Sequence, residues 1–217
     1  MERAARALPF RALLITDRAA CAVRGRGVIE TVAHALDGVD AHQVAVLHRD
    51  KARSAERNLR TVAALRTLCR HAGARMLVHT HVFMATSLGL DGAHLASEAL
   101  STEGEVALAR SLLAPGALLG VSVHASDRVP PDVDYALLAP VFAPTSKPHD
   151  TRPPLGLDGL RAACAASPVP VVALGGIDES NARACIDAGA HAVAVIGAVM
   201  GARDPNTALR HLLDAMC

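Results

Sequence analysis

The run Val169-Pro170-Val171-Val172-Ala173-Leu174-Gly175-Gly176-Ile177 places an apolar segment directly before a pair of glycines. A nearly continuous apolar run of this length is typical of a parallel strand that is covered on both faces. Amphipathic segments with helical periodicity precede it at Leu157–Ala166 and follow it at Glu179–Ala188. The run therefore predicts one strand between two helices, as in a βα repeat.

The same alternation continues outward in both directions along the 217 residues. Eight βα units without a linker or a low-complexity tract predict an α/β fold, a single-domain (β/α)8 TIM barrel over residues 1–217. A doubly wound open sheet is the competing architecture. Only a short turn around Asp127 is expected after the fifth strand. The predicted strands are 12–16, 43–48, 75–80, 92–95, 118–123, 135–140, 169–174 and 192–196, and the predicted helices are 28–36, 55–71, 83–88, 103–113, 157–166, 179–188 and 207–216.

Composition limits the partners and the location. The net charge is +1 and only 2% of residues are aromatic, so the basic field and stacking rings of nucleic-acid binders are missing and no nucleic-acid partner is expected. The longest uncharged stretch, 162–177, is too short to cross a bilayer, so no membrane partner is expected. Five cysteines without a CxxC pair and a charged N-terminus predict a cytoplasmic protein with reduced thiols. The sequence is compatible with a homo-oligomer and with a monomer.

Glycines follow the last two predicted strands. Gly175 and Gly176 end the seventh, and Ile196-Gly197 ends the eighth. In barrels of this kind these two loops often build a phosphate site, because glycine lets backbone N–H groups approach an oxyanion. Tight turns without a ligand are the alternative interpretation of each glycine.

Polar side chains also gather near the ends of the second, third and fifth strands. Ser122 and His124 are two residues apart, hence on one face of the strand, and His124 has the chemistry of a general acid or base. Arg49 and Lys51 share that spacing and supply positive charge for an anionic ligand. A structural histidine and solvated surface charges are the alternatives.

Further positive charge comes from Lys147, in the long loop 142–154 after the sixth strand, which is a candidate lid. His79-Thr80-His81 places two imidazoles on one side of an extended segment. That spacing occurs in some metal sites, although His-x-His alone is a weak pattern for one.

Together these motifs resemble the superfamily of thiamin phosphate synthase and thiazole tautomerase (TenI-like) barrels, over nearly the whole length. The resemblance implies a phosphorylated thiazole as the small-molecule ligand, and it adds Ser146 and His79 to the substrate-binding residues. It rests on Leu14–Arg18, Val46–Lys51, Gly92–Leu95, Gly120–His124, Pro140–Phe142 with Ser146–Lys147, and Ala173–Ile177.

The resemblance breaks at the metal site. Synthases of this family use Mg²⁺ on a pyrimidine diphosphate, and their pattern has Asn-Asp-Arg where this chain has His79-Thr80-His81, and a second Asp where it has Ala99. Leu47 replaces their glutamine. A hydroxyl and a methyl group cannot take the place of carboxylate ligands to Mg²⁺, although Glu98 is one residue away.

These departures predict a metal-independent thiazole tautomerase without a cofactor, in which His124 moves one proton and the glycine loops hold the phosphate. A divergent thiamin phosphate synthase, with Mg²⁺, is the alternative. A non-catalytic phosphate-ligand binder or regulatory protein is the second alternative, since function lives in the site and not in the fold.

Overall fold

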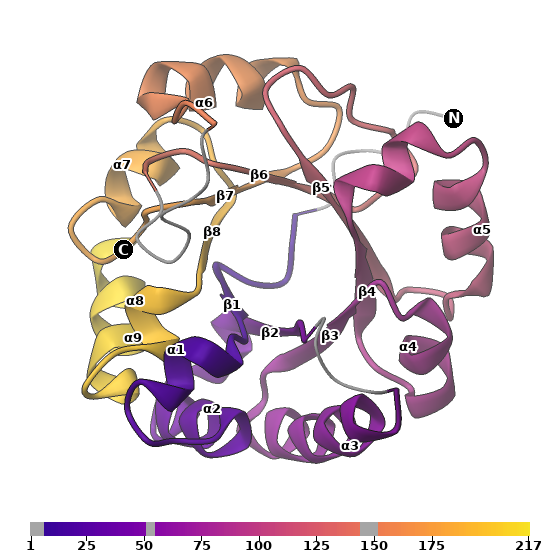
Figure 1. Ribbon diagram of the computed structural model, residues 1–217. Helices are drawn as coiled ribbons and strands as arrows, with labels where there is room; N and C mark the ends of the chain where they lie inside the picture. The colour runs from indigo at the N-terminus through magenta and orange to yellow at the C-terminus, as the bar shows by residue number, and fades with distance from the viewer. Residues whose placement is uncertain (1–6, 51–54, 144–151) are drawn as a thin grey trace.

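Eight parallel strands close into a barrel in the order of the sequence, with β1 paired to both β2 and β8 (Figure 1). The computed structural model describes residues 7–50, 55–143 and 152–217. The predicted (β/α)8 barrel is thus confirmed and the open sheet is excluded. The strands are β1 Ala12–Ile15, β2 Val44–His48, β3 Arg75–His79, β4 Gly92–Leu95, β5 Leu118–Val123, β6 Tyr135–Leu138, β7 Val171–Leu174 and β8 Ala192–Val195.

Helices surround the barrel in a single outer ring (Figure 1). The seven predicted helices are present, with bounds that differ by at most three residues, and α1, α8 and two 3₁₀ turns are additional. Those extra elements are three to five residues long, too short for a periodic pattern. The helices are α1 Arg18–Ala22, α2 Val28–Leu36, α3 Ala55–Ala72, α4 Val82–Leu88, α5 Glu105–Leu112, α6 Gly156–Ala166, α7 Ala182–Asp187, α8 Gly197–Met200 and α9 Pro205–Ala215, with 3₁₀ turns η1 Ala41–Gln43 and η2 Ser97–Ser101.

The connection from β5 to β6 differs from the others. Residues 124–134 contain turns and no helix, as the sequence predicts. A cavity of about 490 Å³ therefore lies outside the barrel wall, between this connection and α6. Among all the described helices, none combines the length and the apolar character that a bilayer crossing requires.

The apolar core has two layers. The outer layer fills the space between the strands and the helices, and the inner layer fills the barrel itself. Leu8 and Phe10 belong to the inner layer although they precede β1, so this segment closes the N-terminal end of the barrel. The Phe10 ring meets Tyr135 edge-on, with 5.8 Å between the ring centroids. The opposite, C-terminal end is left for a site.

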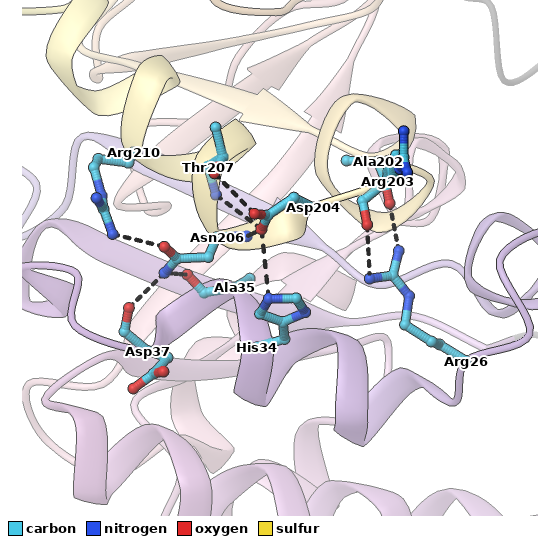
Figure 2. Close-up of polar contacts among 10 residues, drawn as sticks. All are labelled: Arg26, His34, Ala35, Asp37, Ala202, Arg203, Asp204, Asn206, Thr207 and Arg210. Atoms are coloured by element: carbon cyan, nitrogen blue, oxygen red, sulfur yellow. Dashed lines mark hydrogen bonds and ion pairs between the residues drawn. The ribbon is translucent and has the colours of Figure 1, made fainter.

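The first and last parts of the chain are joined by polar contacts as well as by the β1–β8 pairing. Helix α2 packs against α9. Figure 2 shows the guanidinium of Arg26 donating to the carbonyls of residues 202–203, and the amide of Asn206 donating to the carbonyls of Ala35 and Asp37. These bonds connect the two ends of α2 to the loop between α8 and α9 and to the first turn of α9.

Asp204 caps the N-terminus of α9 at this junction. Its side chain accepts from the backbone N–H groups of Asn206 and Thr207, at 3.0 and 3.2 Å (Figure 2). Pro205 occupies the first helical position. His34 of α2 lies 3.4 Å from the same carboxylate. One residue thus starts α9 and contacts α2.

Replacing Asn206 by Ala removes both donated bonds across this junction. We expect the free energy of unfolding to fall by about 1 kcal/mol, because the carbonyl of Ala35, in a partly buried bond, and that of Asp37, in an exposed one, each lose a protein donor. Urea denaturation measures the change. Arg210→Ala is the matched control: within the described residues its exposed guanidinium donates to Asn206 alone, so a change below about 0.5 kcal/mol is expected. Equal effects of the two variants would contradict this account of the junction.

Candidate active site

A cavity of about 360 Å³ opens at the C-terminal ends of the strands. Five of the predicted site residues line it: Arg49, His79, Ser122, His124 and Ile196. Residues that the prediction did not assign to the site also line it, namely His94, Glu98 and Arg152. The cavity is electropositive, because the guanidinium groups of Arg49 and Arg152 outnumber the one carboxylate of the described lining, that of Glu98. This end of the barrel is where (β/α)8 enzymes carry their active sites.

The glycines of the predicted phosphate loops do not line this cavity, although they adjoin its wall. Gly175 and Gly176 have φ values of 109° and 62°, which favour glycine. A Cβ on Gly175 would lie 2.9 Å from the Cα of Pro140, and one on Gly176 would lie 2.7 Å from the carbonyl oxygen of Ala143. Close packing of the loops after β6 and β7 thus accounts for both, and Gly197 begins α8. Their role in phosphate binding stays a prediction.

Three predicted binding residues, Lys51, Ser146 and Lys147, lie outside the described residues, as does most of the predicted lid. Arg152 follows that segment and reaches the cavity. It is one of several arginines in the chain, and only the fold distinguishes it from the others.

A row of aligned residues crosses four neighbouring strands below the cavity. The strand registers pair His79 with His94, His94 with Gly120, and Gly120 with Tyr135. Gly120 leaves the gap that the Tyr135 ring fills, because a Cβ there would lie 2.1 Å from the ring carbon Cζ. The Tyr135 ring therefore reaches across β5 and stacks on His94, with 5.5 Å between the centroids.

Hydrogen bonds connect this row to the cavity. The Tyr135 hydroxyl lies 3.0 Å from Nδ1 of His94, and Nε2 of His94 lies 2.9 Å from the hydroxyl of Ser122. Tyr135 and His94 are fully buried. Burial, with smaller contributions from His79 and Arg49, lowers the pKa of His94 to about 3. This imidazole is therefore neutral at pH 7.

A second buried network positions Arg49. The hydroxyl of Thr16 accepts from the backbone N–H of Arg49 at 3.1 Å and contacts Nδ1 of His48 at 3.0 Å. Nε2 of His48 lies 3.3 Å from the side-chain oxygen of Asn58, whose amide donates to the Asp50 carbonyl at 3.1 Å. Helix α3 thereby fixes the end of β2, from which the Arg49 side chain reaches the cavity.

His124 follows β5 and is held by Asp127. One carboxylate oxygen of Asp127 accepts the backbone N–H of His124 at 2.8 Å and lies 3.1 Å from its Nδ1. The side chain of His124 stays about one-third exposed and borders both the cavity and the space outside the barrel. Asp127, which was predicted only to lie in a short turn, is thus a positioning residue.

The described residues do not fit a Mg²⁺ ion held by paired carboxylates. Thr80 has φ of 62° and its hydroxyl donates to the carbonyl of His79, while Ala99 is buried. Glu98 is the single carboxylate among the described lining residues. No group of three or more His, Cys, Asp or Glu side chains within the described ranges could hold a metal ion. The His79-Thr80-His81 spacing thus forms no metal site with the described residues.

Known proteins agree with the class that the barrel and its cavity define, a (β/α)8-barrel enzyme. A family described as thiamine monophosphate synthase matches residues 12–199. The thiamine-phosphate synthase of Chloroflexus aurantiacus is 37% identical over 207 residues, which cover 94% of this chain and 91% of that protein. The thiamine-phosphate synthase of Moorella thermoacetica is 37% identical over 88% of this chain and 90% of its own.

Solved structures lead to the same family. The thiamine phosphate pyrophosphorylase of Pyrococcus furiosus has a TM-score of 0.78 and 30% identity, with 96% of each chain covered. A 3-hexulose-6-phosphate synthase, at 16% identity and a TM-score of 0.63, shares the fold alone. The chain belongs to the thiamine monophosphate synthase family, as the sequence motifs indicated.

The neutral buried His94 gives stability a defined pH dependence. Because the folded pKa is lowered to about 3 and an unfolded histidine titrates near 6.5, the unfolded chain binds more protons between these values. The contribution of His94 is complete above about pH 6.5 and decreases as the pH falls. From pH 6.5 to 4.5 we expect it to remove roughly 2–3 kcal/mol from the free energy of unfolding.

Urea denaturation of the wild type and His94→Gln at both pH values isolates this contribution, because the other titrating groups are common to the two proteins. The variant is expected to be less stable at pH 6.5 and to lose less stability on acidification. Identical pH dependence in the two proteins would contradict a neutral buried His94.

Proposed function

We propose that this chain is a thiamine-phosphate synthase, which joins a hydroxymethylpyrimidine diphosphate to a thiazole phosphate. The observation that carries the proposal is similarity to thiamine-phosphate synthases over 94% of the chain. The electropositive cavity at the ends of the strands supports it, since both substrates carry phosphoryl groups.

The expectation of a thiazole tautomerase is wrong. It gave most weight to two substituted positions, Thr80 and Ala99, whereas the relatives that match nearly the whole chain are thiamine-phosphate synthases. The stated alternative, a divergent synthase, is better supported. A change of metal ligands alters how charge is neutralised, and it does not by itself exclude the synthase reaction, because function depends on the whole site.

The proposed reaction moves no proton in its coupling step. The bond between the pyrimidine methylene carbon and the diphosphate oxygen breaks, and the diphosphate leaves with the electron pair. The thiazole nitrogen forms the new C–N bond with its lone pair, so the products are thiamine phosphate and pyrophosphate. The chain therefore has to orient two substrates and stabilise the charge that develops on the leaving group.

Arg49 and Arg152 are the groups we assign to that charge. Both line the cavity, and Arg49 is held by the Thr16–His48–Asn58 network. Guanidinium groups bind phosphoryl oxygens through charge-assisted, often bidentate bonds. The predicted phosphate loops, Gly175-Gly176 and Ile196-Gly197, would then hold the thiazole phosphate, in line with their position after β7 and β8.

The direct test incubates the purified protein with both substrates and measures thiamine phosphate and pyrophosphate, with Mg²⁺ and with EDTA. Formation of both products in equal amounts supports the proposal. Binding of the phosphorylated substrates without any product would instead identify a non-catalytic binder. The comparison with EDTA reports independently whether the chain needs a divalent cation despite its substituted carboxylate positions.

His124 provides a second test. A general base typically contributes about 10²–10⁴-fold to kcat, whereas the coupling step proposed above needs none. We therefore expect His124→Gln to reduce kcat by less than about 10²-fold, with no loss of a pH-profile limb near the ordinary histidine pKa of about 6.5. Steady-state kinetics between pH 5.5 and 8.5 measure this. A larger loss together with a vanished limb would show that a proton transfer at His124 controls turnover.

A further inference from the structure

Ser122 is the one member of the Tyr135–His94–Ser122 chain that reaches the cavity through a hydroxyl, and the direction of its hydrogen bonds decides what it offers to a ligand. A serine hydroxyl has one hydrogen to donate. If that hydrogen is used by His94, the ligand meets only an acceptor. If His94 donates to Ser122 instead, the hydrogen is free for the ligand.

Tyr135 determines which of these arrangements holds. Its hydroxyl is fully buried, and among the described residues its one hydrogen-bond partner is Nδ1 of His94, at 3.0 Å. Burial raises the pKa of Tyr135, so the phenol keeps its hydrogen. A buried hydroxyl hydrogen without an acceptor is strongly disfavoured. The Tyr135 O–H therefore donates to Nδ1.

The hydrogen bond from Tyr135 in turn fixes the tautomer of the His94 imidazole. A neutral histidine carries one hydrogen, so an Nδ1 that accepts from Tyr135 requires the hydrogen on Nε2. Nε2 lies 2.9 Å from the Ser122 hydroxyl and donates to it. The two charged groups that act on the pKa of the ring, His79 and Arg49, are cationic or neutral, so neither supplies a negative charge that would favour imidazolium.

We propose that Tyr135 and His94 act as positioning residues: they fix the direction of the hydrogen bonds so that the Ser122 hydroxyl donates its hydrogen into the cavity, where a phosphoryl oxygen of the substrate would accept it. The donor would act beside Arg49 and Arg152, the two guanidinium groups of the same cavity. Three donors that converge in one cavity suit an anionic oxygen better than a ring nitrogen or a carbonyl. The choice of ligand rests on the proposed function, whereas the direction of the hydrogen bonds from Tyr135 through His94 to Ser122 does not.

The direction of the two hydrogen bonds of His94 can be observed in the unmodified protein. Long-range ¹H–¹⁵N correlation spectra distinguish the two neutral histidine tautomers from imidazolium, and the His94 signals are identified by their loss in His94→Gln. The expected result at pH 7 is a neutral ring with hydrogen on Nε2. A ring with hydrogen on Nδ1, or a charged ring, would overturn the proposal. This measurement is independent of any activity.

The consequence for binding is tested by calorimetry with two probes, inorganic pyrophosphate and inorganic phosphate. They distinguish a leaving-group oxygen from the thiazole phosphate as the partner of Ser122. Ser122→Ala is expected to weaken one of them about tenfold or more, because a charge-assisted hydrogen bond is lost. Ser111→Ala, which removes an exposed hydroxyl that bonds only within α5, is the matched control and should change neither.

Tyr135→Phe separates positioning from packing, since it removes only the hydroxyl. In the wild-type background it is expected to weaken the same probe several-fold, because His94 is no longer held in one tautomer. In the Ser122→Ala background it should have no further effect. Equal losses in both backgrounds, or no binding of either probe by the wild type, would overturn the proposal. An Nε2–H ring in a protein without synthase activity would reject the proposed function and leave the positioning chain intact.

Discussion

The interior of this barrel depends on an absent side chain at Gly120. The central strand of the row His94–Gly120–Tyr135 carries no Cβ, so the largest ring of the interior crosses it and stacks on the imidazole of its second neighbour. The same ring also makes an edge-on contact with Phe10. One tyrosine thus connects the segment that closes the N-terminal end of the barrel to the polar groups below the cavity.

This arrangement gives the cavity a rigid floor. Interiors are close-packed, so a ring fixed between Phe10 and His94 has little room to change its position. The wall at Arg49 is fixed in a different way, by hydrogen bonds from β1 and α3 to the end of β2. Both devices use groups that are buried and paired, which is the condition under which polar groups inside a core specify one geometry.

Family membership and local chemistry point to different properties of the site. Similarity over nearly the whole chain supports synthase chemistry, whereas Thr80 and Ala99 cannot supply the carboxylates of the family pattern. The two observations are compatible if the cavity neutralises phosphoryl charge through guanidinium groups. The error of the tautomerase expectation was to treat a missing metal ligand as a missing reaction.

The barrel can be predicted from the amino-acid sequence alone, because eight apolar runs between amphipathic segments specify strands that must be covered on both faces. The spacing of two residues along a strand also predicted that Arg49, Ser122 and His124 lie at strand ends, and all three line the cavity, as does His79, which the family resemblance had indicated. Which distant residues join them in the cavity depends on the tertiary fold. The stacking of Tyr135 on His94 needs the register of three strands, and the reach of Arg152 into the cavity needs the course of the chain after β6. Neither is a local property, because each depends on contacts between residues far apart in the chain.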